Sequence, residues 1–217
     1  LKEQVDALPP EQAAAKIALL SKMVEVYRDH LKLDSMVVST YVAILALDPR
    51  HEGAIDALSA RFEATGRWND LIQLLQRRLA LAEEPGAQTP HAGTATADPS
   101  TVPDAAAIAA QVQILFRMAD LWGEKLGNQV QAAATLQQIL ALAQTDERAV
   151  NELQGIYERR RNWRELVDLL NAQAALHTGD ARRTLLLRVA ELSADKLNEP
   201  AEAIESLNAI LAESPQN

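Results

Sequence analysis

Residues 58–75 read LSARFEATGRWNDLIQLL, and residues 153–170 read LQGIYERRRNWRELVDLL. The two stretches belong to a longer self-similarity. A shift of 95 residues aligns 19–81 with 114–176 without a gap and gives 18 identities in 63 positions. A similarity of this length at a fixed offset is typical of repeat architectures, in which each unit packs only against its neighbours. We therefore interpret the chain as an array of repeats.

The third copy of the unit is partial, and an insertion separates the first copy from the second. A shift of 71 residues aligns 114–144 with 185–215, with 11 identities in 31 positions. The two shifts differ by 24 residues, and the excess lies in 85–104, which reads PGAQTPHAGTATADPSTVPD. This segment has almost no large apolar side chain to offset the entropy of ordering, so we expect a disordered inserted loop. Helical repeats are predicted over 1–84 and over 105–217, as one continuous solenoid.

Composition and spacing both favour helices. Of the 217 residues 39 are Ala and 32 are Leu, whereas Gly, Pro and aromatic residues number only 8, 9 and 8. In residues 163–170 the apolar positions fall at i, i+3, i+4 and i+7, which is one face of a helix. We expect an all-α protein of ten helices in five antiparallel pairs. The predicted helices are 10–31, 34–47, 51–65, 68–83, 104–126, 129–143, 146–160, 163–177, 180–197 and 200–213.

Three stretches resemble the tetratricopeptide repeat. Residues 203–215 keep the spacing Ala-x3-Leu-x2-Ile-x4-Pro of its second helix, and residues 37–49 repeat that spacing as Val-x3-Tyr-x2-Ile-x4-Pro. Residues 58–71 have Leu-x3-Phe-x3-Gly-x-Trp-x2-Leu, which is similar to the turn between its two helices. The resemblance implies a right-handed superhelical solenoid whose first helices line a concave groove. It also implies a scaffold that binds a peptide or helix of a partner protein in that groove.

A charge pattern recurs on the first helix of each unit, where an acidic residue follows a basic one after seven positions. These pairs are Lys22 and Asp29, Arg117 and Glu124, and Arg188 and Asp195. Seven residues are two helical turns, so each pair lies on one face of its helix. The resemblance implies that this face meets the bound peptide. The other interpretation is a row of ion pairs between repeats, each of which contributes little at a surface.

The intervening helices add four further candidates. Asp56, Glu63, Asn151 and Glu158 are expected to face the same groove. Trp68 and Trp163 begin equivalent helices, each with Leu three residues later, and we interpret them as packing wedges rather than ligand anchors. The run 159–161 consists of three Arg residues at a predicted helix end, where cations favour the helix dipole, and we interpret it as structural.

Several classes of function are disfavoured. The net charge of −9 has the wrong sign for holding phosphate backbones, and no nucleic acid is expected. The sequence contains no Cys, no glycine-rich phosphate loop, no HExxH and no GxSxG. None of the four His residues is spaced as a metal ligand, so we expect no enzyme activity, no cofactor and no metal. No apolar run approaches the ~20 residues that span a bilayer, so no membrane insertion is expected.

Other functions stay open on sequence alone. A helical-repeat RNA-binding module would use the same architecture, as would a regulatory or substrate-recruiting domain of an enzyme outside this sequence, or a spacer without a ligand. Ala-rich surfaces could also support self-association. The chain has 15 Arg residues but only 6 Lys residues, and this bias suggests a GC-rich, bacterial source. We expect a cytoplasmic protein that forms part of a larger protein or assembly.

Overall fold

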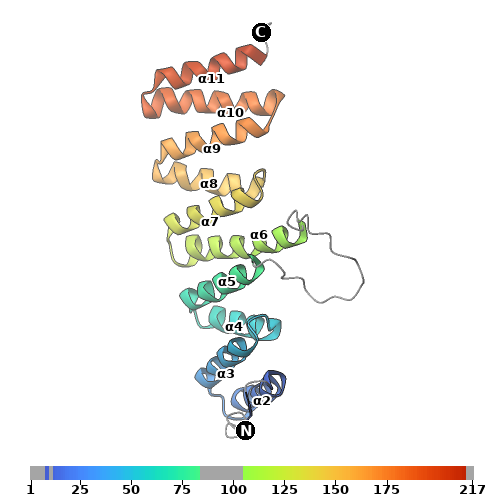
Figure 1. The fold of residues 1–217 in the computed structure, drawn as a ribbon. Coiled ribbons are helices and arrows are strands. Elements are labelled where there is room, and N and C mark those ends of the chain that lie inside the picture. Colours follow the sequence, from blue (N-terminus) through green and yellow to red (C-terminus); the bar gives the residue numbers. More distant parts are fainter. Residues whose placement is uncertain (1–7, 10–11, 84–104, 214–217) are drawn as a thin grey trace, which may run out of the picture. The chain divides into compact units, whose positions relative to one another are not determined.

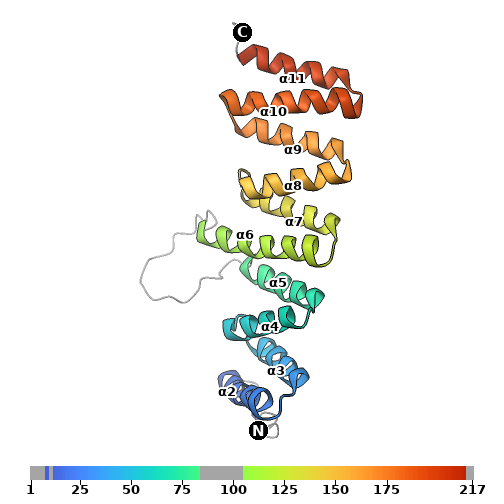
Figure 2. The ribbon, with the colours of Figure 1, turned by 180° about the vertical axis from the view of Figure 1, so that it is seen from behind.

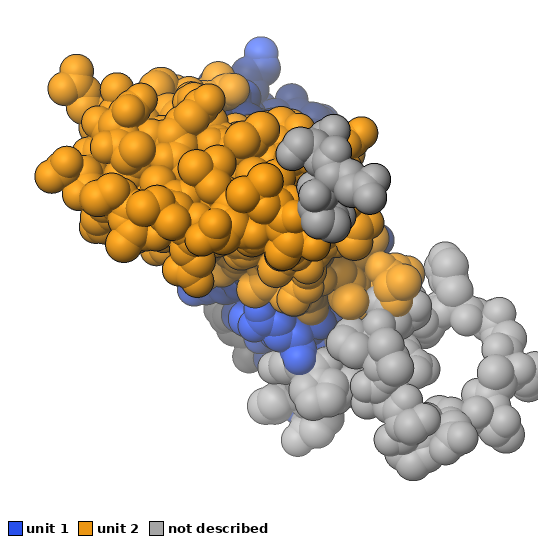
Figure 3. Space-filling model, turned by 90° about the horizontal axis from the view of Figure 1, so that it is seen from above, with its two compact units in different colours: residues 1–102 blue, residues 103–217 orange. Residues whose placement is uncertain are grey.

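The computed structural model describes residues 8–9, 12–83 and 105–213, and every regular element in these residues is helical (Figures 1 and 2). The chain divides into two compact units, residues 1–102 and residues 103–217, which Figure 3 shows in different colours. The predicted helix pairs are confirmed, with boundaries within about three residues of those expected. The predicted disordered loop over 85–104 lies outside the described residues.

The first unit contains two helix pairs. Its elements are α2 (Ala13–Glu25) with the π-helical turn η1 (Val26–His30), α3 (Asp34–Leu47), α4 (Glu52–Ala64) and α5 (Trp68–Glu83). Each helix packs against the next, so the pairs form one row. Leu58 of α4 is only 1% exposed, and Leu20, Ile44 and Leu71 are also buried. Within a helix the buried positions recur at i, i+3 and i+4, as in Leu71, Leu74 and Leu75 of α5, so one face of the helix turns inward.

The second unit repeats this arrangement over three helix pairs. Its elements are α6 (Ala105–Asp120) with η2 (Leu121–Lys125), α7 (Gln129–Leu142), α8 (Glu147–Arg160), α9 (Trp163–Leu176), α10 (Gly179–Leu192) with η3 (Ser193–Leu197), and α11 (Pro200–Glu213). Successive helices again lie side by side with alternating direction (Figure 1). The counterparts of the first unit's core residues under the 95-residue shift, Leu115, Ile139, Leu153 and Leu166, are buried as well. The repeat found in the sequence is therefore a repeat of packing.

The backbone follows the same periodicity at residues whose side chains differ. Lys32, Gly127 and Asn198 occupy equivalent positions and have φ of 52°, 65° and 56°. Gly66 and Arg161 are also equivalent, with φ of 67° and 56°. Positive φ lets the chain reverse after a helix, where the last carbonyls need new donors. The turns between helices are thus the same in each copy, although only some carry the glycine that such a turn favours.

Each long first helix ends in a π-helical turn, which the sequence did not predict. In the three copies an amide donates to the carbonyl six residues earlier, over 2.9, 2.7 and 2.8 Å. The donor and acceptor pairs are Leu33 to Tyr27, Asn128 to Trp122, and Glu199 to Ser193. The wider turn satisfies carbonyls at the helix end, and it brings the chain directly into the second helix of each pair.

Candidate functional site

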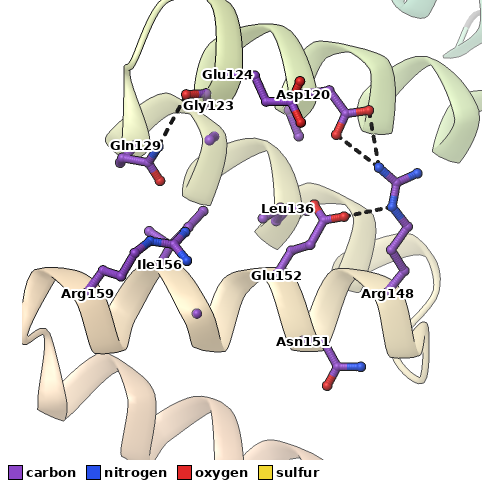
Figure 4. Close-up of a pocket in the computed structure, with 13 residues that line it drawn as sticks. Asp120, Gly123, Glu124, Gln129, Leu136, Arg148, Asn151, Glu152, Ile156 and Arg159 are labelled. Atoms are coloured by element: carbon purple, nitrogen blue, oxygen red, sulfur yellow. Dashed lines mark hydrogen bonds and ion pairs between the residues drawn. The ribbon is translucent and has the colours of Figure 1, made fainter.

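The second unit has a hollow of about 450 Å³ between α6 with η2, α7 and α8, here called hollow 1 (Figure 4). Small residues make room for it, since Ala119, Gly123, Ala132 and Gly155 all contribute to its lining. A Cβ at Gly155 would lie 3.2 Å from Nη1 of Arg159, so a larger residue there would crowd the lining. The larger apolar side chains of Leu136 and Ile156 also line it, and charged residues surround them.

One wall of hollow 1 is fixed by Arg148 at the start of α8. Its Nη2 donates to both carboxylate oxygens of Asp120 over 2.9 and 3.1 Å, and its Nε donates to Oε1 of Glu152 over 2.7 Å (Figure 4). The guanidinium carbon also lies 4.2 Å from the centroid of the Phe116 ring. The hydrogen bond that Arg148 donates to Glu152 is the main reason that the pKa of Arg148 is raised. Asp120 and Phe116 belong to α6, so Arg148 ties α8 to α6 across the edge of the hollow.

The second hollow, here called hollow 2, has a volume of about 250 Å³ and lies among α8, α9 and α10 with η3. Arg188 crosses it, with Nη2 lying 3.4 Å from Oε1 of Glu158 on α8 and Nη1 lying 3.2 Å from Oε2 of Glu191. The Nζ of Lys196 lies 5.8 Å from the centroid of the Trp163 ring, within the range of a cation–π contact. Ionic and aromatic groups therefore meet in one exposed depression.

The two hollows have the same balance of charge. Three carboxylates and two cations line each of them. In hollow 1 they belong to Asp120, Glu124, Glu152, Arg148 and Arg159, and in hollow 2 to Glu158, Glu191, Asp195, Arg188 and Lys196. With all groups ionised, each hollow carries a net charge of about −1. This arrangement favours a cationic group over an anionic one.

The structure brings five of the ten sequence-predicted residues together in these hollows. Glu124 and Asn151 line hollow 1, whereas Glu158, Arg188 and Asp195 line hollow 2. The remaining five lie elsewhere. Arg117 is half-buried on α6, and Lys22, Asp29, Asp56 and Glu63 are exposed on the first unit.

Some of the charged residues predicted to bind a partner instead form ion pairs within the chain. Arg188 bridges α10 to Glu158 on α8, at two positions that were predicted to bind a partner. Asp29 instead accepts hydrogen bonds from its sequence neighbour Arg28 over 2.8 and 3.0 Å, and this hydrogen bonding lowers the pKa of Asp29. Both side chains of the Arg188–Glu158 pair are about half exposed, so the pair adds at most about 1 kcal/mol to stability.

Sequence reasoning missed the residues that shape hollow 1. Arg148 and Glu152 correspond under the 95-residue shift to Gly53 and Ala57, so a search for recurring charges passes over them. Their i, i+4 spacing was the available signal. The interpretation of Trp163 also needs extension, because its ring is half-buried and lines hollow 2.

Among the residues that the structure describes, no group of three or more His, Asp or Glu side chains is arranged to hold a metal ion. None of the helices that the structure describes has the length and apolar character needed to cross a bilayer.

Comparison with known proteins confirms the resemblance to the tetratricopeptide repeat. The family model described as "Tetratricopeptide repeat" matches residues 54–89, which include the spaced residues 58–71 at the turn from α4 to α5. No curated protein sequence matches the chain significantly.

Solved structures also match this chain, and one of them is described as a tetratricopeptide repeat protein. A repeat protein from Parabacteroides merdae shares 16% identity, with 92% of this chain and 66% of that chain covered and a TM-score of 0.38. The MamA protein shares 12% identity, with 92% of both chains covered and a TM-score of 0.39. The APC/C hetero-tetramer Cut9–Hcn1 shares 16% identity, with 100% of this chain and 42% of that chain covered and a TM-score of 0.29.

Proposed function

We propose that this chain is a non-catalytic interaction module that binds a peptide segment of a partner protein along α6, α8 and α10 of its second unit. The observation that carries the proposal is the pair of hollows, each with a mixed-charge rim. Such depressions between the first helices of successive pairs offer side-chain sites along an extended ligand, and many modest contacts add up to specific binding.

The charge balance indicates which peptides fit best. Three carboxylates and two cations in each hollow favour a ligand that inserts a Lys or Arg side chain. Arg148 is already held by two carboxylates, which makes that wall rigid before a ligand arrives. Binding to a preformed wall costs less side-chain entropy than binding to a mobile one. The ligand class is therefore a basic peptide, and its binding weakens as salt is raised.

Selection from a random peptide library displayed on phage tests this proposal. The expected outcome is enrichment of peptides with spaced Lys or Arg residues. Their affinity is then measured by calorimetry against the Glu124→Lys/Asp195→Lys double variant, which reverses one carboxylate in each hollow. Both side chains are exposed, so the fold is expected to tolerate the change. We expect binding to weaken by more than tenfold.

A matched control separates local from general electrostatics. Glu165→Lys/Asp168→Lys changes the net charge by the same amount, on exposed positions of α9 that line neither hollow. The control variant is expected to bind like the wild type. Equal losses in both double variants, or selection of acidic peptides, would contradict the proposal.

A further inference from the structure

Hollow 2 differs from hollow 1 in having an aromatic ring in its lining. The half-buried ring of Trp163 lines hollow 2 beside the buried side chain of Leu192, whereas none of the described residues that line hollow 1 is aromatic. The ring of Phe116 near hollow 1 already has the guanidinium of Arg148 over it, 4.2 Å from its centroid. Of the two hollows, hollow 2 is therefore the one that offers a ring face to a ligand.

A cation of the chain itself shows that this ring face is accessible. Lys196 is exposed, and its Nζ lies 5.8 Å from the centroid of the Trp163 ring. This distance is near the limit of about 6 Å for a cation–π contact, so the contact is weak. Within the part of the chain that the structure describes, Lys196 forms no ion pair. A ligand cation that replaces Lys196 over the ring therefore breaks no ion pair.

The carboxylates around the ring are unequally engaged. Nη2 of Arg188 lies 3.4 Å from Oε1 of Glu158, and its Nη1 lies 3.2 Å from Oε2 of Glu191. Asp195 precedes Lys196 in the chain and is an exposed residue of the same lining. Among the described residues no cation is paired with Asp195. Asp195 is thus the carboxylate of hollow 2 that is left to bind an incoming cation.

The seven residues that line hollow 2 recur as a set in the sequence. Each has a counterpart of the same chemical kind, under the 95-residue shift for α8 and α9 and under the 71-residue shift for α10 and η3. The two sets are Glu158, Trp163, Arg188, Glu191, Leu192, Asp195 and Lys196, and Glu63, Trp68, Arg117, Asp120, Leu121, Glu124 and Lys125. Arg148 and Gly155 of hollow 1 instead correspond to Gly53 and Ala60. The combination of one Trp with three carboxylates and two cations therefore belongs to the repeated unit.

We propose that hollow 2 is an arginine-binding subsite, at which a guanidinium of the partner peptide stacks on Trp163 in the place of Lys196 and donates hydrogen bonds to Asp195. The inference rests on the proposed function and names the basic side chain that this hollow selects. A guanidinium is planar and weakly hydrated, so it stacks on an indole more favourably than an ammonium does, and it binds a carboxylate through two donors. Hollow 1, without an aromatic residue in its described lining, accepts Lys and Arg alike.

Single amino-acid derivatives provide the probes. They are N-acetylarginine amide and N-acetyllysine amide, which carry the same charge. Binding to the full chain is followed by NMR at the indole Nε1–H signal of Trp163, which is identified as the signal lost in Trp163→Phe. The signal of Trp122, which lines neither hollow, is the internal control. We expect N-acetylarginine amide to shift the Trp163 signal with a Kd on the order of 10 mM, about threefold more tightly than N-acetyllysine amide.

Two substitutions at exposed positions test how the guanidinium is held. Lys196→Ala removes the competing cation and is expected to tighten binding of N-acetylarginine amide by about threefold. Its control, Arg160→Ala, removes one positive charge at an exposed position outside both hollows and should leave the affinity unchanged. Asp195→Asn is expected to weaken binding by about threefold, whereas the control Asp168→Asn on α9 should have no effect.

Three results would overturn the arginine subsite. They are equal affinity of the wild type for both amides, no shift of the Trp163 signal at about 20 times the expected Kd, and an affinity that Lys196→Ala leaves unchanged or weakens. Selection of basic peptides together with an unresponsive Trp163 signal would support the proposed function and overturn the subsite. A responsive Trp163 signal together with selection of acidic peptides would support the subsite and contradict the proposed function.

Discussion

Replacing Arg161 by Gly tests the equivalence of the repeats at the level of the backbone. Arg161 follows α8 with φ of 56° and ψ of 32°, in the left-handed region, where Gly66 stands after α4. In both turns the next amide, that of Asn162 or Arg67, donates to the carbonyl five residues earlier, over 2.9 and 2.8 Å. A side chain in this conformation costs about 1–2 kcal/mol, which Gly avoids. Gly loses more conformational entropy on folding, however, and this loss offsets part of the gain in stability.

We therefore expect Arg161→Gly to stabilise the chain by about 1 kcal/mol and to raise the Tm by about 2–4 °C. Urea unfolding followed by circular dichroism measures the change in the free energy of unfolding. The dependence of this free energy on urea concentration should be the same in the wild type and the variant. Arg160→Gly is the matched control, because Arg160 ends α8 and Gly there costs up to about 1 kcal/mol. Lower stability of Arg161→Gly would show that the side chain at residue 161 does not strain this turn.

Three further predictions concern the second unit. Leu153→Ala removes a side chain that is 1% exposed and is expected to cost about 2–5 kcal/mol in urea unfolding; a loss below about 1 kcal/mol would be inconsistent with this packing. Tyr157→Phe removes the hydrogen bond that Gln137 donates and should lower the free energy of unfolding by about 1 kcal/mol. Burial raises the pKa of Tyr157 above the ordinary value of 10.0, so the absorbance titration of the variant should lack one tyrosine that ionises at high pH. Hydrogen bonding from Arg164 lowers the pKa of Glu199, so the stability advantage of the wild type over Arg164→Gln should shrink as the pH falls below 4.5; an advantage independent of pH would contradict this ion pair.

The helices could be predicted from sequence because their apolar periodicity and their repetition give the same boundaries. Leu58 and Leu153, for example, are related by the shift and are both 1% exposed. The turns were harder to predict. Gly66 is the residue type that favours a left-handed position, whereas its equivalent Arg161 is not, since the surrounding hydrogen bonds rather than its own preference impose the conformation.

The candidate site was only partly predictable for a related reason. Recurring charges pointed to Glu124 and Arg188, which line the two hollows. Hollow 1 also depends on Arg148 and on Gly155, which stand where the first copy has Gly53 and Ala60. A comparison of copies finds what repeats, whereas this part of the surface is specific to one copy. Its detection needs the distances across α6 and α8.

The most direct test of the proposed groove is to map where a bound ligand lies. A peptide selected against the wild-type chain is made with a photoreactive residue beside one of its basic side chains, irradiated in complex with the full chain, and mapped by mass spectrometry. We predict crosslinks to residues that line hollow 1 or hollow 2, such as Asn151 and Asp195. Crosslinks confined to exposed residues away from both hollows, such as Ala134 of α7 or Asp168 of α9, would contradict it.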